Sequence, residues 1–299
     1  MTSKQQKLKT NQVAELLAKH NSFALFSHTR PDGDTIGATM ALKLALETIN
    51  KSVDVFCDTP IEGSLLKFDS VKDFILTPPT KSYDLCIAID CGDIFRLGNN
   101  MDFFSKQEET LTVDHHGGEF YSKYNCIESL SSTAEIVYEI LTAMNIVINS
   151  DIATYLYIGL CTDTGNFSHG NTTCNSFVVA SKLCPYGIDI ERINRLFFKD
   201  KSLDSTKFMG SIISRARSYF DGKLILLYIT SSDLNKYNLT QSASEGIVNY
   251  AIDVDSALVG ICVCEYSDNA YKVSMRGKNF NVRQICNTFG GGGHINASG

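Results

Sequence analysis

Short apolar runs, each ending in polar residues, recur through the first half of the chain. Residues 23–26 (FALF), 85–89 (LCIAI) and 111–113 (LTV) are rich in branched and aromatic side chains, which predicts buried strands. Residues 52–57 alternate apolar and polar positions as a strand does. Other segments repeat small and apolar residues every three or four positions. These predicted helices are residues 11–20, 35–49, 132–145 and 151–160. Strands that alternate with helices predict an α/β fold with a doubly wound, mostly parallel sheet.

The last third of the chain predicts a second, smaller α/β domain. Its expected strands and helices are residues 224–230, 257–265 and 271–275, and 244–252 and 282–289, respectively. Between Glu191 and Arg217 the chain has seven Lys or Arg against three acidic residues, in a pattern that predicts a helical, locally basic linker. We therefore expect a first domain over residues 1–186, a linker over 187–218 and a second domain over 219–299.

Imidazoles and carboxylates follow the predicted strands of the first domain. In parallel sheets, sites form at the carboxyl ends of the strands, so these side chains are expected to meet. The polar residues at these strand ends are His28, Asp32, Asp34, Asp90, His115, His116 and Asp163. This donor set suits Mn²⁺, with Mg²⁺ and Co²⁺ as alternatives, and the lack of thiolate ligands argues against structural zinc. Two such metals about 3.5–4 Å apart can hold a hydroxide nucleophile and stabilise a phosphoryl group, which predicts a dinuclear hydrolase.

Two predicted helix starts, near Asp34 and at Ser132, also have ordinary structural interpretations. Asp34 could cap the helix that follows it, with Pro31 and Gly33 as turn residues. Ser132 begins a Ser-x-x-Glu capping box, and the same helix start could instead receive a phosphate through free N–H groups and the hydroxyls of Ser132 and Thr133.

Composition narrows the class of protein. The 299 residues are 43% hydrophobic and have a net charge of −6, which fits a soluble globular protein and argues against a broad basic surface for long nucleic acids. The chain has neither an apolar run long enough to cross a membrane nor a signal-peptide pattern at its start, so we expect a cytoplasmic location and no membrane partner. Ten cysteines without a Cys-x-x-Cys pair predict reduced, mostly buried thiols.

Five motifs together resemble the DHH-family phosphoesterases with a DHH-associated C-terminal domain. In the chain they read HTRPDGD (28–34), AID (88–90), DHH (114–116), CTDTG (161–165) and a tail with SMRGK (274–278) and GGGGHINASG (290–299). The branch that the chain most resembles is the bacterial oligoribonuclease (nanoRNase) and pAp-phosphatase group. Each motif alone would be weak, but the order and coverage of the set are specific.

The resemblance implies a role for each matching residue. His28, Asp32 and Asp90 would hold one metal, and Asp34, Asp90, His115 and Asp163 the second, with Asp90 bridging. His116 would face the scissile phosphate as a hydrogen-bond or proton donor, and Asp114 would orient a histidine. The active site would lie in a cleft between the domains. The residues of the second domain expected to bind the nucleotide are Arg276, Gly291, Gly292, Gly293 and His294.

The expected activity is therefore hydrolysis of short oligoribonucleotides (nanoRNA) to mononucleotides, removal of the 3′-phosphate of pAp, or both, by two metals and a bridging hydroxide. Expected partners are short RNA, pAp or dinucleotides, and a homodimer is implied by the resemblance. Gly277 stands where related chains often have a serine, so that hydroxyl contact would be missing. The alternatives are a phosphodiesterase of cyclic dinucleotides or their linear products, an inorganic pyrophosphatase and a non-catalytic nucleotide sensor. The preferred substrate, the polarity of attack and the resident metal stay open.

Overall fold

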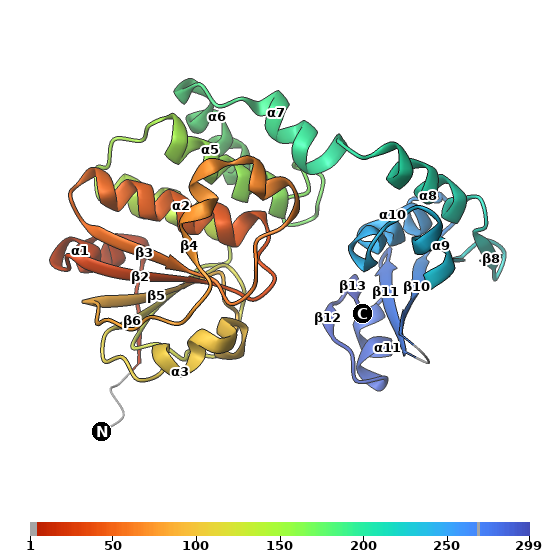
Figure 1. Cartoon of the computed structure of the whole chain (residues 1–299), viewed down its shortest axis with the longest axis horizontal. Coiled ribbons are helices and arrows are strands. Elements are labelled where there is room, and N and C mark those ends of the chain that lie inside the picture. Colours follow the sequence, from red (N-terminus) through yellow and green to blue (C-terminus); the bar gives the residue numbers. More distant parts are fainter. Residues whose placement is uncertain (1–4, 268–269) are drawn as a thin grey trace. The chain divides into compact units, whose positions relative to one another are not determined.

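The chain folds into two compact units, Met1–Lys199 and Asp200–Gly299. The computed structural model describes residues 5–267 and 270–299 (Figure 1). The segment expected as a helical linker is shared between them, because α7 (Ile190–Asn194) belongs to the first unit and α8 (Leu203–Ile213) to the second. Each unit has its own hydrophobic core.

A parallel sheet forms the centre of the first unit. Its strands are β1 (Gln6–Lys7), β2 (Ser22–Ser27), β3 (Ser52–Phe56), β4 (Phe74–Ile75), β5 (Leu85–Ile89), β6 (Thr110–Asp114) and β7 (Tyr124–Ile127). They lie in the order β1-β7-β6-β5-β2-β3-β4, and every pairing is parallel. The chain builds outward from β2 in one direction through β3 and β4, and then in the other through β5, β6 and β7. A doubly wound sheet of this kind has its topological switch point beside the first central strand, here β2.

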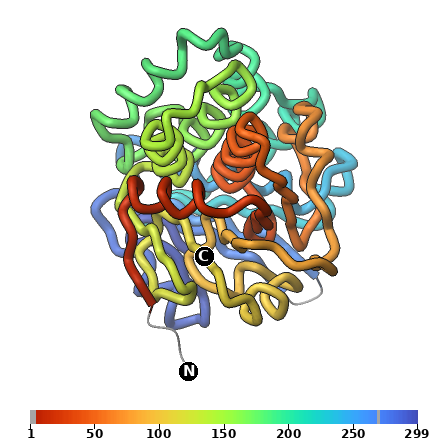
Figure 2. The backbone as a smooth tube through the Cα atoms, turned by 90° about the vertical axis from the view of Figure 1, so that its left-hand side faces the viewer, coloured from red at the N-terminus to blue at the C-terminus, as the bar shows by residue number. Residues whose placement is uncertain are grey.

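Helices cover both faces of this sheet, as the sequence predicts. The α-helices of this unit are α1 (Thr10–Lys19), α2 (Gly33–Thr48), α3 (Met101–Phe104), α4 (Thr133–Ala143), α5 (Ser150–Asp163), α6 (Cys174–Leu183) and α7. Helices α2 and α4 pack over one face, with α5 packed on these two helices and α1 beside α4, and α3 lies on the other face (Figures 1 and 2). Strand β2 shows why both faces are apolar. Phe23 and Leu25 enter the core under α2, whereas Phe26 enters the core under α3.

Helices α2 and α5 approach closely because glycines lie at their crossing. A Cβ atom built on Gly37 would lie 2.5 Å from the Tyr155 carbonyl oxygen and 2.8 Å from the Gly159 nitrogen. Only hydrogen fits at such a distance between two backbones. This crossing sets the depth at which α2 lies over the sheet, and with it the position of Asp34 in the first turn of α2.

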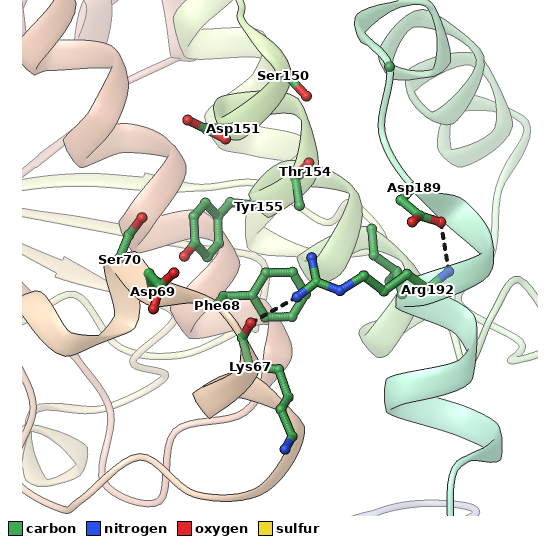
Figure 3. A pocket seen from close by; sticks show the side chains of 12 residues that line it. Lys67, Phe68, Asp69, Ser70, Ser150, Asp151, Thr154, Tyr155, Asp189 and Arg192 are labelled. Carbon is green, nitrogen blue, oxygen red and sulfur yellow. Dashed lines mark hydrogen bonds between the residues drawn. The ribbon is translucent and has the colours of Figure 1, made fainter.

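Helix α7 is fastened to the rest of the unit by Arg192. Its guanidinium lies 5.0 Å over the ring of Phe68 and donates a hydrogen bond of 2.9 Å to the carbonyl oxygen of Lys67 (Figure 3). The side chain crosses a polar cavity of about 430 Å³ between α5, α7 and the segment after β3, with the buried Tyr155 in its wall. None of the predicted metal ligands lines this cavity.

The second unit has a mixed sheet. Its strands are β8 (Arg217–Tyr219), β9 (Leu224–Ile229), β10 (Val259–Ser267), β11 (Ala270–Gly277), β12 (Gly293–His294) and β13 (Ala297–Ser298), in the order β12-β13-β11-β10-β9-β8. Its helices are α8, α9 (Ser231–Lys236), α10 (Ile247–Ile252) and α11 (Val282–Thr288). The pairing of β9 with β10 is parallel and the others are antiparallel. The prediction of a large, mostly parallel α/β domain with a smaller α/β domain is confirmed.

The region between β3 and β5, expected as a loop, contains two 3₁₀ helices, Gly63–Lys67 and Asp69–Asp73, and the edge strand β4. A two-residue strand leaves no periodicity in the sequence, which is why the pattern does not reveal it. All ten cysteines are free thiols, and eight of them are buried. In the parts of the chain that the structure describes, no helix is both long and apolar enough to cross a membrane. The cytoplasmic location stays a prediction.

Candidate metal centre

Three strand ends bring the predicted ligands together. His28 follows β2, Asp90 follows β5, and Asp114 ends β6 just before His115. Among the described residues, ligand atoms gather in sets whose members all lie within 4.8 Å of one another. These sets are His28, Asp32 and Asp90; Asp34, His115 and Asp163; and Asp90, Asp114, His115 and His116. The convergence at the carboxyl edge of the sheet, expected from the sequence, is present in the structure.

Asp90 belongs to two of these sets. Its Oδ2 is 3.5 Å from His28 Nε2, and its Oδ1 is 3.7 Å from His115 Nε2 and 3.4 Å from His116 Nδ1. The residue is buried and has a φ of 60°, a left-handed conformation that is costly for a non-glycine residue. The turn after β5 therefore aims one carboxylate at histidines on both sides.

Two histidines present their Nε2 atoms to these carboxylates. The Nδ1 atom of His28 lies 2.9 Å from the carbonyl oxygen of Thr29, and that of His115 lies 3.3 Å from the carbonyl oxygen of Leu130. A carbonyl only accepts, so each Nδ1 carries a hydrogen and Nε2 faces the acids. The Nε2 of His115 is buried without a hydrogen bond among the described residues. This arrangement fits a cation that lies between Nε2 and the carboxylates.

The charge of the site also fits a cation. Burial and the nearby charges of Asp90 and Asp163 raise the pKa of Asp34 well above its usual value. Burial likewise raises the pKa of Asp163 to about 6, with Asp90 and Asp32 adding to the effect of burial and His115 opposing it. Burial lowers the pKa of His28, but the interactions with Asp32 and Asp90 outweigh burial and raise it to about 9. Several buried carboxylates thus share one region and favour positive charge within it.

His116 differs from the other two histidines. Its Nδ1 lies 2.8 Å from Asp114 Oδ1, which also accepts the backbone N–H of His116 at 2.9 Å. The hydrogen bonds with Asp114 and Asp90 raise the pKa of His116 to about 10, although burial opposes them. The ring therefore carries a positive charge at neutral pH and is a hydrogen-bond donor. Asp114 orients a histidine in the structure, as the resemblance implies.

The two acids before and at the start of α2, Asp32 and Asp34, have different roles. Asp32, and not Asp34, caps the helix, since its Oδ1 accepts the N–H groups of Asp34 and Thr35 at 3.1 Å each. Asp34 lies in the first turn, fully buried and directed at α4. The capping interpretation of Asp34 is wrong because the helix begins at Gly33, two residues before the predicted start at Thr35.

The first turn of α4 has no N–H group left for a phosphate. Thr133 and Ala134 donate theirs to Asp34, at 2.7 and 2.9 Å, and the N–H of Glu135 is accepted by the hydroxyl of Ser132 at 3.2 Å. The hydroxyl of Thr133 donates to Asp90 Oδ1 at 2.9 Å. Ser132 is the cap, as predicted. The N–H groups considered for phosphate binding donate to the carboxylate of Asp34 instead.

Asn171 is a residue near the site that the sequence pattern does not reveal. Its Nδ2 lies 3.3 Å from Asp163 Oδ2, 3.2 Å from the Asp163 carbonyl oxygen and 2.9 Å from that of Ser131. The amide joins the loop after α5 to the loop before α4. The polar run from Thr162 to Thr173 marks a loop in the sequence, but nothing in it distinguishes Asn171 from its neighbours.

The predicted nucleotide-binding residues lie in the second unit. Arg276 on β11 and His294 on β12 both pair with Ala297 on β13. Residues paired across antiparallel strands direct their side chains to the same face, so Arg276 and His294 share one face of the sheet. Burial lowers the pKa of the half-buried Arg276.

The glycines at residues 291–293 lie close to neighbouring backbone atoms. The N–H of Gly291 donates to the carbonyl oxygen of Cys286 and that of Gly292 to Gly299, both at 2.9 Å. A Cβ on Gly291 would lie 2.2 Å from the Gly299 carbonyl oxygen, and one on Gly293 would lie 2.6 Å from that of Ala297. Substrate binding by Gly291, Gly292 and Gly293 stays a prediction.

Comparison with known proteins finds similarity to the family that the motifs resemble. Residues 22–160 match the model of the DHH family, N-terminal domain. The chain is 28% identical over 294 residues to a protein of Thermus thermophilus named "Bifunctional oligoribonuclease and PAP phosphatase NrnA", and the match covers 96% of this chain and 86% of that protein.

Solved structures share the fold. A crystal structure of an exopolyphosphatase-related protein from Bacteroides fragilis superposes with a TM-score of 0.89 at 24% identity, covering 97% of this chain and 89% of that one. An exonuclease RecJ bound to manganese superposes with a TM-score of 0.54 at 11% identity, covering 97% of this chain and 89% of that one. The motifs at the strand ends, the match of residues 22–160 to the DHH N-terminal domain and the relatives along nearly the full length make the chain similar to DHH-family proteins.

Proposed function

We propose that this chain is a metal-dependent phosphoesterase that hydrolyses short oligoribonucleotides to mononucleotides and removes the 3′-phosphate of pAp. The observation that carries the proposal is the position of Asp90, whose two oxygens face His28 and His115 and so join two sets of ligands. Relatives similar over nearly the whole chain are named for oligoribonuclease and PAP phosphatase activities, which supports the substrate class.

The donor set supports two divalent cations. His28, Asp32 and Asp90 would hold one, and Asp34, Asp90, His115 and Asp163 the other. Manganese is the proposed metal because imidazole and carboxylate ligands suit it and because a RecJ structure of the same fold contains it. When bound, such a pair lowers the pKa of water and stabilises charge on a phosphoryl group.

The side chains of the protein supply positioning and a proton. His116, charged at neutral pH and oriented by Asp114, would donate a hydrogen bond or a proton to the phosphate or its leaving oxygen. Arg276 and His294 would bind a phosphate of the nucleotide from the second unit. A homodimer, implied by the resemblance, also belongs to this proposal.

A product-resolved hydrolysis assay with Mn²⁺ tests the proposal. It compares pAp, a labelled RNA trimer, a long RNA, pyrophosphate and a cyclic dinucleotide. Mononucleotides from the trimer and phosphate from pAp, with the long RNA left intact, are expected. Asp90→Asn should lower both rates at least about a hundredfold, because it removes one charge shared by both ligand sets. Turnover of pyrophosphate or the cyclic dinucleotide alone would contradict the proposed substrates, and full activity of Asp90→Asn would contradict the bridging role.

A further inference from the structure

We propose that Thr133 is a positioning residue that holds two carboxylates of the metal centre, Asp34 and Asp90, in the orientation that binds cations. The inference rests on the proposed function, since it concerns metal binding at the same site. It assigns a new role to a residue that the sequence marks as the start of a helix and a candidate phosphate contact.

Thr133 contacts both carboxylates at once. Its N–H donates to Asp34 Oδ2 at 2.7 Å, and its hydroxyl donates to Asp90 Oδ1 at 2.9 Å. All three residues are buried, with Thr133 fully inaccessible to solvent. Asp34 comes from α2, Asp90 from the turn after β5, and Thr133 from α4, so one residue joins three elements at the site.

The hydroxyl decides how the Asp90 carboxylate is turned. A carboxylate only accepts, so the Thr133 hydroxyl must be the donor. It binds Oδ1, the oxygen that also faces His115 and His116. With Oδ1 held there, Oδ2 is directed at His28 Nε2, 3.5 Å away. Loss of the hydroxyl would let the carboxylate rotate away from one of its two ligand sets.

Helix formation alone does not require a threonine here. Ser132 provides the cap by accepting the N–H of Glu135, so the Thr133 hydroxyl is not needed for that purpose. Branched residues such as threonine also form helices less well than alanine. The positive end of the α4 dipole adds to the stabilisation of the buried Asp34 carboxylate. The side chain and the backbone of Thr133 thus serve two different acids.

Manganese binding tests the role of the hydroxyl. In Thr133→Val a methyl group replaces the hydroxyl at nearly constant volume, and in Thr133→Ser the hydroxyl is kept. Binding of Mn²⁺ to the full-length protein is measured by electron paramagnetic resonance or calorimetry, alongside the thermal midpoint of each variant. We expect Thr133→Val to weaken Mn²⁺ binding about tenfold to a hundredfold and Thr133→Ser to bind like the unchanged protein. We also expect the absorption bands of bound Co²⁺ to change in Thr133→Val and to match those of the unchanged protein in Thr133→Ser.

Thr110→Val is a matched control at the opposite end of β6. Thr110 is also buried, and its hydroxyl accepts the Lys123 N–H at 2.9 Å, away from any predicted ligand. It should lower the thermal midpoint without changing Mn²⁺ affinity. If Thr133→Val does not fold, Thr133→Ala takes its place. Wild-type affinity in Thr133→Val, or equal losses in Thr133→Val and Thr133→Ser, would overturn the inference. Failure of the unchanged protein to bind Mn²⁺ would instead overturn the proposed function.

Discussion

The residues of the candidate site divide into those that the motifs display and those that hold them. His28, Asp90 and His115 stand at strand ends, where a single sequence is informative. Thr133 contacts Asp90 from a helix start, and Asn171 contacts Asp163 from a loop. Their residue types are common in caps and loops, so the sequence offers ordinary explanations for them. Only the distances to the carboxylates show that these two residues contact the site and do more than cap a helix or form a loop.

Asp54 provides a test of electrostatics away from the metal centre. Its Oδ2 accepts the Tyr83 hydroxyl and lies 2.7 Å from Lys81 Nζ. Burial raises the pKa of Asp54, but these two partners outweigh burial and lower it below its usual value. A carboxyl whose folded pKa is lowered adds stability above its unfolded pKa, near 4, and loses it as pH falls through the folded value.

We therefore expect Asp54→Asn to reduce the free energy of unfolding by about 0.5–1 kcal/mol at pH 7, because the pair is partly exposed. The difference should shrink as pH falls below about 4. Urea titrations of both proteins at pH 7, 5 and 3 measure it. A difference that stays constant across this range would show that the charge of Asp54 does not contribute.

At the scale of elements, the contact of α2 with α5 positions the acids. Both helices carry a glycine at the crossing, and a Cβ on Gly159 would lie 2.7 Å from Asp34 Oδ1. Helix spacing and ligand position are thus set by the same contact. Helical periodicity predicts each helix separately but not the face on which two helices meet.

Gly37→Ala tests this contact. The new methyl group would meet the backbone of α5, which cannot move aside as a flexible side chain could, so the helices must separate. We expect a loss of about 1–3 kcal/mol in stability and weaker Mn²⁺ binding. Gly210→Ala on α8 is the matched control, because its Cβ would meet no atom within 4 Å, and it should stabilise by about 0.5–1 kcal/mol. Equal stability of the two variants would show that the crossing tolerates a side chain.

At the scale of the whole molecule, the predicted metal ligands and the predicted nucleotide-binding residues belong to different units. The predicted metal ligands belong to residues before 199, whereas Arg276 and His294 belong to the second unit. The two largest buried hydrophobic clusters likewise fall in separate units. Each unit is large enough to fold around its own core.

A fragment of residues 1–199 should therefore fold and bind Mn²⁺ with the affinity of the full chain. It should hydrolyse the RNA trimer with a much higher KM, since the proposed phosphate-binding residues are missing. Calorimetry and the trimer assay measure the two properties, and Asp90→Asn in the fragment controls for specific metal binding. Trimer hydrolysis at the full-length KM would contradict a substrate-binding role for the second unit.

The sequence by itself determined the fold class, the edge of the sheet where the predicted ligands gather and the resemblance to the DHH family. Strand and helix periods and residues at strand ends are local properties, and local patterns survive in a single sequence. The short strand β4, the packing of α2 on α5 and the contacts of Thr133 and Asn171 were decided by tertiary structure alone. Each depends on residues brought together from distant parts of the chain, and no local pattern encodes which of them meet. Tertiary contacts likewise decided that Asp32 caps α2 while Asp34 faces α4. Two nearby aspartates in a sequence do not show which of them has which role.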